Sequence, residues 1–346
     1  MRIAQVAPLY ESVPPKLYGG TERVVSFLTE GLVRQGHDVT LFASGDSTTA
    51  ARLVPVTPHS LRLDESCIDR LAHHVLMVEQ VVKRSGEFDV IHFHIDYLHY
   101  PVSRRANVPQ VTTLHGRLDI PDLVPLYREF TDMPVVSISN DQRRPLPDAA
   151  WQATIHHGLP SDLLDFHPHP DDYLAFLGRI SREKRPDRAI EIAKRAGMRL
   201  KIAAKVDDAD REYFDREIEP LLGQAHVEFV GEINEQQKNN FLGRARGLLF
   251  PIDWPEPFGL VMIESMACGT PVVAFPCGAV PEVIDEGITG CLCDSIDSAV
   301  ACVGRLANWD RRACRAKFEE RFTIERVARQ YVDVFKTLVC RRNAHG

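Results

Sequence analysis

Short apolar runs rich in valine and isoleucine alternate along this chain with longer segments of helical periodicity. This alternation is typical of βα units, in which parallel strands are buried between helices. The pattern occurs twice, so we expect an α/β fold with two Rossmann-like, doubly wound parallel-sheet domains that face each other across a cleft. The predicted strands lie at residues 3–7, 39–43, 90–94, 111–114 and 135–138, and again at 174–177, 200–204, 227–230, 248–250 and 272–275.

The chain has 346 residues, which is enough for two domains that each bury a core of their own. Residues 161–172 are rich in proline, aspartate and histidine and have no sustained periodicity, which indicates a linker. The final helix carries one apolar side and is expected to pack back across the seam between the domains. The predicted parts are an N-terminal domain at 1–160, this linker, a C-terminal domain at 173–322 and the final helix at 323–341.

The charge pattern gives no reason to expect a nucleic-acid partner, because 48 acidic and 41 basic residues are spread along the whole length and leave a net charge of -7. The N-terminus lacks the apolar core of a signal peptide, and no apolar run is long enough for a membrane span. A cytoplasmic location is therefore expected. Cys291 and Cys293 fall two apart on a predicted strand, but without CxxC pairs the cysteines are expected to be reduced thiols.

In a nicotinamide-dependent enzyme, a GxGxxG loop should directly follow the first strand. No such motif follows residues 3–7, and the nearest paired glycines, Gly19 and Gly20, come later. A dehydrogenase is therefore disfavoured.

The segment EPFGLVMIE joins a predicted strand end to a helix that is expected to begin near Phe258. The backbone N–H groups of Gly259 and Leu260 would then be first-turn donors, which suit a diphosphate. Glu256 lies before the helix and Glu264 lies within it, so two carboxylates flank the predicted anion site. Because a carboxylate accepts hydroxyl hydrogen bonds, one suits a sugar and the other a ribose; the alternative is a solvated cap and an exposed helix residue.

Two basic residues follow the strand at 174–177. Arg179 and Lys184 leave the same edge of the sheet as Glu256, where a guanidinium and an ammonium can neutralise phosphates. For the single residues of the stretch REKRPDR, a solvated basic loop is the competing interpretation.

Five motifs, YGGTER, TLHG, GRISREK, EPFGLVMIE and GAVPEVIDEGITG, occur in the order seen in glycosyltransferase family 4, and the chain resembles that family over nearly its whole length. The resemblance implies a GT-B fold, retention of anomeric configuration and no requirement for a metal ion or other cofactor. It makes Glu264 the ribose ligand and Glu256 a ligand of the transferred sugar. The remaining implied site residues are Phe258, Gly259 and Leu260 near the diphosphate, Arg179 and Lys184 on the leaving group, Gly19 and Gly20 in the N-terminal glycine loop, and His115 near the reacting carbon. Arg185 departs from the family, which commonly has glycine after the lysine.

The expected reaction moves a hexose from a nucleoside-diphosphate sugar to a hydroxyl acceptor. UDP is favoured because it is the most frequent nucleotide in the family. The expected acceptor is a saccharide, a lipid-linked glycan or a natural product. A lipid-linked acceptor would be compatible with peripheral contact at the inner membrane face. The oligomeric state is open.

One alternative comes from His92, His94 and Asp96, which alternate on one face of a strand and resemble part of a binuclear metallohydrolase site. If the chain is a glycosyltransferase, these residues are expected to line the acceptor side of the site. The same is expected of Ser139 and Asn140, which follow the predicted strand at 135–138. A non-catalytic nucleotide-sugar binder is the other alternative.

Overall fold

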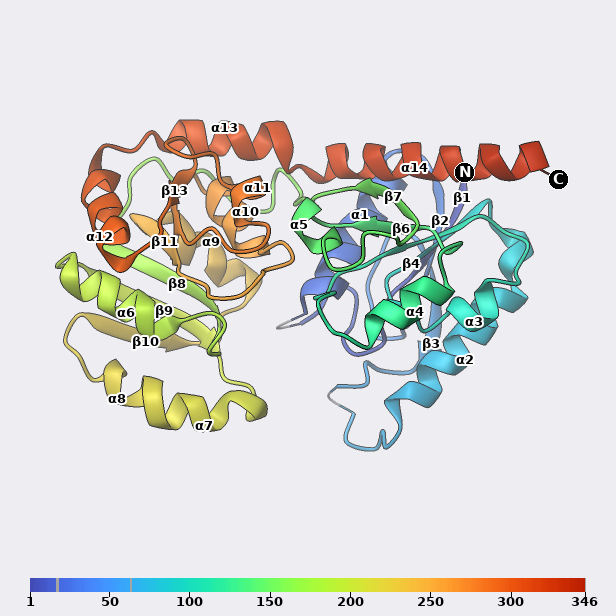
Figure 1. The fold of residues 1–346 in the computed structure, drawn as a ribbon, viewed down its shortest axis with the longest axis horizontal. Helices are drawn as coiled ribbons and strands as arrows, with labels where there is room; N and C mark the ends of the chain where they lie inside the picture. The colour runs from blue at the N-terminus through green and yellow to red at the C-terminus, as the bar shows by residue number, and fades with distance from the viewer. Residues whose placement is uncertain (17–18, 63, 346) are drawn as a thin grey trace. The chain divides into compact units, whose positions relative to one another are not determined.

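The computed structural model describes residues 1–16, 19–62 and 64–345, and the chain divides into two compact units. The N-terminal unit consists of Met1–Pro160 and Ile324–Gly346, and the C-terminal unit is Ser161–Thr323. Each unit contains one sheet in which every neighbouring pair of strands is parallel (Figure 1). The prediction of two Rossmann-like parallel-sheet domains is confirmed.

The sheet of the N-terminal unit has seven strands in the order β3-β2-β1-β4-β5-β6-β7. β1 is an inner strand, in which Ile3 pairs with Val39 on one side and with Val90 on the other. These side chains are buried, as expected for strands covered on both faces. The strands are β1 (Arg2–Val6), β2 (Asp38–Ser44), β3 (Arg52–Thr57), β4 (Val90–Phe93), β5 (Gln110–Thr113), β6 (Val135–Ser137) and β7 (Trp151–Thr154).

Helices of very different length connect these strands. Among the helices that lie between strands in the sequence, α1 and α2 are the longest. They pack on the sheet through apolar side chains such as Leu28, Leu32 and Met77. No described helix has the length and apolar character needed to cross a membrane. The helices of this unit are α1 (Gly20–Arg34), α2 (Arg70–Lys83), the single turn η1 (Ser85–Glu87), α3 (Tyr100–Ser103), α4 (Leu123–Glu129), α5 (Asn140–Arg143) and α14 (Ile324–His345).

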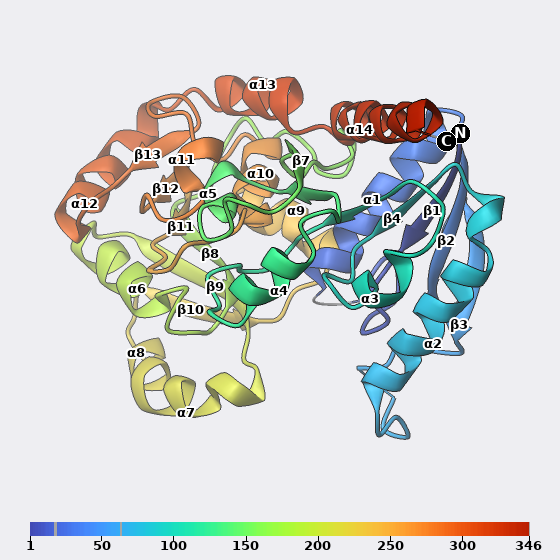
Figure 2. The same ribbon diagram turned by 45° about the vertical axis from the view of Figure 1, so that its right-hand side comes forward.

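The C-terminal helix α14 belongs to the N-terminal unit and lies alongside α1 (Figure 2). Its residues Val327, Tyr331 and Phe335 are buried in the cluster that contains Ile3 and Leu28. The sequence placed this apolar face at the seam between the domains, whereas the structure buries it against the sheet of the N-terminal unit. The physical reason is burial of apolar surface, because this face of α14 and the side chains of Ile3 and Leu28 cover one another.

The sheet of the C-terminal unit has six strands in the order β10-β9-β8-β11-β12-β13. Its core is built from apolar side chains such as Leu174, Ile202 and Leu249. The strands are β8 (Tyr173–Arg179), β9 (Arg199–Lys205), β10 (Val227–Gly231), β11 (Gly247–Phe250), β12 (Val272–Ala274) and β13 (Gly290–Leu292). The helices are α6 (Pro186–Arg195), η2 (Asp208–Asp210), α7 (Arg211–Tyr213), η3 (Phe214–Ile218), α8 (Glu219–Leu222), α9 (Glu235–Gly243), α10 (Leu260–Ala267), α11 (Val280–Val283), α12 (Ile296–Arg305), η4 (Leu306–Asn308) and α13 (Arg311–Arg321).

The segment predicted as a linker, 161–172, is packed into the C-terminal unit. The backbone N–H of His167 donates to the carbonyl of Cys268 at 3.0 Å, and its carbonyl accepts from Arg311 at 2.7 Å. Leu164 is 2% exposed. Without helical or strand periodicity, the sequence could not show that this loop is held by long-range hydrogen bonds.

The expectation of reduced cysteines is wrong at one pair. Cys291 on β13 and Cys302 on α12 form a disulfide with a Cα–Cα distance of 6.5 Å. Helix α12 packs on the sheet, and this brings the two residues together across a separation of 11 positions. Cys293 remains a free, buried thiol, so Cys291 and Cys293 do not act together.

In each sheet the order of strands reverses between two neighbours, β1 and β4 in the N-terminal unit and β8 and β11 in the C-terminal unit. Loops that leave the carboxyl ends of such strands run in opposite directions and open a crevice in which ligands bind. In the C-terminal unit the predicted site residues lie at the end of β8 or follow β8 and β11, whereas in the N-terminal unit they are spread over the ends of β1, β4, β5 and β6.

Candidate functional site

Lys184 and Glu256 meet at the reversal point of the C-terminal unit. Lys184 follows β8, Glu256 follows β11, and the ammonium forms an ion pair with the carboxylate. The side chains are only 15% and 11% exposed. Trp254 donates from Nε1 to the same carboxylate at 2.9 Å, and its ring centroid lies 5.1 Å from the Lys184 Nζ. Lys184 and Glu256 therefore form one preorganised group with Trp254, a residue that the motifs did not indicate.

Glu264 lies one turn into α10 with its side chain 2% exposed. Its Oε1 accepts from the Nζ of Lys238 on α9 at 2.7 Å. The alternative of an exposed helix residue is therefore wrong. Lys238, which is 13% exposed, offered no sequence signal beyond its place in the first turn of a capped helix.

Helix α10 begins at Leu260, later than the predicted start near Phe258, and Gly259 is its N-terminal cap. Gly259 has φ 83, a left-handed conformation that glycine adopts without strain. Phe258 is 2% exposed and its ring centroid lies 6.3 Å from that of Phe322, so its side chain packs in the core. The backbone N–H groups of Gly259 and Leu260 remain the predicted anion-binding element, and Phe258 contributes packing.

Gly278 holds the segment of Glu256 from the other side. The N–H of Ala279 donates to the Glu256 carbonyl at 2.9 Å. A Cβ at Gly278 would lie 2.3 Å from the backbone N and O atoms of Glu256. The motif GAVPEVIDEGITG thus positions Glu256 through close backbone contact.

Arg179, the last residue of β8, points at a cluster of carboxylates. Its guanidinium lies 3.4 Å from Asp207, 3.6 Å from Asp210 and 3.9 Å from Glu183. Asp207 and Asp210 follow β9, and neither was predicted from the sequence. The carboxylates balance the charge of Arg179 while its side chain stays 28% exposed.

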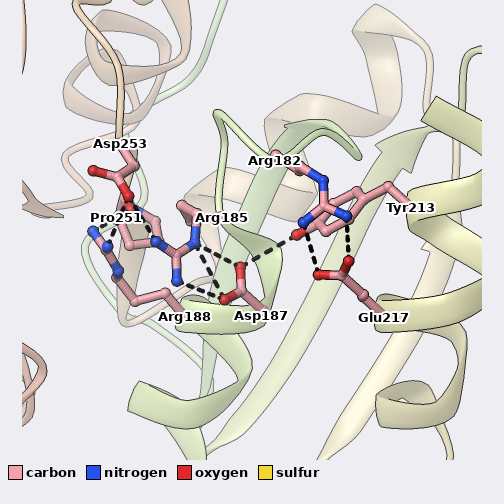
Figure 3. A network of polar contacts seen from close by, with 8 residues as sticks. All are labelled: Arg182, Arg185, Asp187, Arg188, Tyr213, Glu217, Pro251 and Asp253. Carbon is pink, nitrogen blue, oxygen red and sulfur yellow. Dashed lines mark hydrogen bonds and ion pairs between the residues drawn. The ribbon is translucent and has the colours of Figure 1, made fainter. Parts of the chain in front are cut away.

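Arg185 and Arg188 form a structural network rather than a solvated surface, whereas Arg182 is solvated, with its side chain 69% exposed (Figure 3). Arg185 bonds to Asp187 at 2.8 Å and to Asp253 at 2.7 Å. Arg188 reaches Asp253 as well, at 3.2 Å, and Arg182 pairs with Glu217. Asp253 follows β11, so these contacts fasten the loop after β8 to the loop that carries Glu256.

Arg185 occupies the position where the family commonly has glycine, and its φ of 54 explains that preference. A left-handed conformation costs a non-glycine residue about 1–2 kcal/mol, and the two ion pairs offset part of this cost. We expect Arg185→Gly to be more stable than Arg185→Ala by about 1 kcal/mol, after allowance for the more flexible unfolded chain of glycine. Denaturant unfolding of both variants measures the difference, and an alanine variant of equal or greater stability would contradict it.

In the N-terminal unit, His92, His94 and His115 form a hydrogen-bonded cluster with Gln5 at the ends of β1, β4 and β5, in which His115 is half-buried and the other three residues are buried. His94 Nδ1 lies 2.8 Å from His115 Nε2, and His94 Nε2 lies 2.8 Å from Gln5 Oε1. His92 bonds to Gln5 at 3.3 Å and to Thr113 at 2.7 Å. Sequence reasoning missed Gln5, which lies 87 and 89 positions from its two partners.

These contacts argue against the metallohydrolase interpretation. Both ring nitrogens of His92 and both of His94 are already bonded to protein atoms. Asp96 is exposed and has φ 51, and the residues that the structure describes contain no group of three or more His, Cys, Asp or Glu side chains arranged to hold a metal. Burial lowers the pKa of His92 and His94 well below the ordinary value and lowers that of His115 to about 3, so the cluster is neutral at pH 7.

Ser139 and Asn140 serve the architecture around His115. Ser139 caps α5 by accepting from the N–H of Gln142 at 3.1 Å. Gln142 in turn donates to the carbonyls of Leu114 and Gly116, at 2.9 and 2.8 Å, and thereby holds the loop of His115. Asn140 accepts from Thr154 at 3.0 Å.

Gly19 and Gly20 lie at the start of α1, after β1. A Cβ at Gly19 would lie 2.7 Å from the Cβ of Pro15, so this position needs glycine for space. Nothing lies within 4 Å of a Cβ at Gly20. Glu22 of the same motif is 5% exposed, and burial raises its pKa.

Comparison with known proteins covers both units. Residues 165–310 match the family Glycosyl transferases group 1, and residues 18–156 match Glycosyltransferase Family 4. A phosphatidyl-myo-inositol mannosyltransferase of Mycolicibacterium smegmatis is 26% identical over 90% of this chain and 86% of its own length. Sucrose-phosphate synthase of Thermosynechococcus elongatus has a similar fold, with a TM-score of 0.78 and 19% identity over 98% of this chain and 99% of that chain. Anabaena HepE, solved with UDP and glucose, has a TM-score of 0.73 and 17% identity over 97% of this chain and 100% of that chain.

The two family matches cover both predicted domains, and they agree with the five motifs and with the reversal-point placement of the site residues. The chain is an enzyme of GT-B fold and belongs to glycosyltransferase family 4.

Proposed function

We propose that this enzyme transfers a hexose from a nucleoside-diphosphate sugar to a hydroxyl acceptor, with retention of configuration and without a metal ion or other cofactor. UDP is the nucleotide that we propose first, since the similar HepE was solved with UDP. The proposed acceptors are a saccharide, a lipid-linked glycan or a natural product. A lipid-linked acceptor would bring the protein to the inner membrane face as a peripheral partner.

The pairing of Lys184 with Glu256 carries this proposal. Each group is the partner of the other in a mostly buried place. The oxygens of a diphosphate would also accept hydrogen bonds from the ammonium of Lys184. Because the ammonium has three donors, it can bond to the phosphate and to the Glu256 carboxylate at the same time. The carboxylate of Glu256 would then accept hydroxyl hydrogen bonds from the sugar.

The nucleoside end of the donor is assigned to Glu264. Its Oε1 is occupied by Lys238, which supplies the positive charge that a buried carboxylate needs. Oε2 is then available to the ribose diol.

The proposed reaction breaks the bond between C1 of the sugar and the diphosphate oxygen. The acceptor oxygen bonds to C1 on the face from which the diphosphate leaves, and its proton passes to a phosphate oxygen. Lys184, Arg179 and the N–H groups of Gly259 and Leu260 stabilise the charge that develops on the leaving group. His115, which is neutral, orients a hydroxyl of the sugar.

A thermal-shift screen tests the donor class. A ligand that binds only the folded protein raises Tm in proportion to the logarithm of its concentration above Kd. We expect one of UDP, GDP and ADP, with its sugars, to raise Tm clearly more than the other two. If none of them raises Tm at millimolar concentration, the proposed nucleotide-sugar site is wrong.

Glu264→Gln is expected to weaken binding of the selected nucleoside diphosphate by about 10- to 100-fold, because hydrogen bonds to a charged group contribute about 1.5–3 kcal/mol. Titration calorimetry measures the change. The matched control is Glu235→Gln, which removes the more distant carboxylate near Lys238, at 3.5 Å, and should bind almost as the wild type does. Equal losses in both variants would mean that the charge of Lys238 matters and that Glu264 does not contact the ligand.

A further inference from the structure

The hydrogen bonds of the histidine cluster form one continuous chain through the N-terminal unit. It runs from His115 to His94, Gln5 and His92, and then through Thr113 to the hydroxyl of Tyr331 on α14, with the last distance 2.9 Å. Gln5, His92, His94 and Thr113 are each 2% exposed or less. Because water does not compete at these positions, each link must have one donor and one acceptor.

The amide of Gln5 sets the direction of the whole chain. Its Oε1 faces His94, so His94 donates from Nε2 and its Nδ1 carries a lone pair. His115 must therefore donate to that lone pair from its own Nε2. On the other side, the Gln5 Nε2 group donates to His92 Nδ1, and His92 donates from Nε2 to Thr113.

A neutral imidazole with its proton on Nε2 has an acceptor at Nδ1. The Nδ1 atom of His115 is buried and has no hydrogen-bond partner among the residues that the structure describes. The ring of His157 stacks on His115 at 5.3 Å with an interplanar angle of 17°, which fixes the plane of the ring. A buried acceptor without a partner costs free energy unless a ligand supplies the donor.

We infer that Gln5 and His94 are positioning residues that hold His115 in the Nε2–H form, so that its Nδ1 accepts a hydrogen bond from a hydroxyl of the transferred sugar. This inference rests on the proposed function for the identity of the ligand. It adds a selectivity rule, because a sugar that carries hydrogen or fluorine in place of that hydroxyl leaves the Nδ1 lone pair unpartnered. This rule applies to the sugar alone and does not distinguish donors by their nucleotide.

The direction of the chain can be read without any substrate. Long-range ¹H–¹⁵N spectra distinguish a protonated ring nitrogen from an unprotonated one, and a His115→Gln variant assigns the signals of His115. In the wild-type enzyme at pH 7 we expect a protonated Nε2 and an unprotonated Nδ1. A protonated Nδ1, or exchange between both forms, would overturn the inference whether or not the protein binds nucleotide sugars.

Variants then test the link to the substrate. With the donor found by the thermal-shift screen, a set of monodeoxy sugar donors should contain one whose kcat/KM is about 10-fold lower than that of the parent sugar. Gln5→Met removes the amide that sets the direction, and it should shrink this ratio to about 3-fold or less and give mixed His115 signals. His94→Asn keeps an oxygen acceptor for His115 Nε2 and should retain the ratio, whereas His94→Leu should lose it.

These readouts separate positioning from general destabilisation. A variant that is only less stable would lower activity with both donors equally and leave the ratio unchanged, and that result in folded Gln5→Met would overturn the inference. If Gln5→Met does not fold, the wild-type ring signals and the His94 pair still decide it. Failure of the proposed function would appear separately, as no Tm shift with any nucleotide sugar.

Discussion

Replacing Lys184 with alanine is expected to lower kcat by about 10²- to 10³-fold, the usual loss for one transition-state charge stabiliser. The ammonium is 15% exposed and is held between the Glu256 carboxylate and the ring of Trp254. In such a place a positive charge interacts with a developing phosphate charge more strongly than it does in water. The rate of nucleoside diphosphate release from the selected donor measures the effect.

Two further variants make the Lys184 result specific. Lys194→Ala removes an exposed lysine near the end of α6 and should leave kcat unchanged. Removal of Lys184 also leaves the buried Glu256 carboxylate without its cation, which costs stability. The double variant Lys184→Ala/Glu256→Gln should regain Tm but not kcat. A Lys184→Ala enzyme with unchanged kcat would disprove the catalytic assignment.

Gly278→Ala is expected to destabilise the C-terminal unit by about 2–5 kcal/mol, which corresponds to a fall in its Tm of roughly 5–15 °C. The added Cβ would lie 2.3 Å from backbone atoms of Glu256, and the residue has φ 60. Because backbone cannot rotate away as a side chain can, the loop of Glu256 must move. Scanning calorimetry gives the change in Tm, and titration with the nucleotide sugar should show weakened binding.

Gly287→Ala is the matched control for this effect. Gly287 lies in the same motif with φ 77, and nothing is within 4 Å of an added Cβ. It should therefore show only the left-handed strain, about 1–2 kcal/mol, and normal binding. If both variants lose equal stability, the backbone contact at Glu256 does not matter.

The sequence predicted all inner strands and the edge strand β10, and it missed the edge strands β3, β7 and β13. Strands such as β11 and β12 are buried along their whole length, so their sequences are continuous apolar runs. By contrast, β3 contains Pro55 and has only one fully buried position, and all four positions of β7 are half-buried. Edge strands of this kind have no pattern that separates them from loops. The burial of α14 and the Cys291–Cys302 disulfide depend equally on contacts that periodicity does not contain.

The same limit applies to the site. Glu256, Gly259 and Glu264 are close in sequence, so local helix geometry was enough to predict an anion site with flanking carboxylates. The partners that tune them are remote: Lys238 is 26 positions from Glu264, and Gln5 is 89 from His94. Trp254 and Asp207 were missed because a motif defines ligand contacts, whereas these side chains contact the predicted ligand-binding residues.

The measurement that tests the account most directly is ¹H NMR of the sugar released from the selected donor, recorded at early times with a chelator present. Water serves as the acceptor, and the anomeric signals of the new sugar are read before they equilibrate. We predict that the wild-type enzyme releases one nucleoside diphosphate per sugar, that the first sugar has the anomeric configuration of the donor, and that Lys184→Ala reduces the rate. A first product of inverted configuration, a strict need for a metal ion, or a donor that binds but is never cleaved would contradict the proposed reaction.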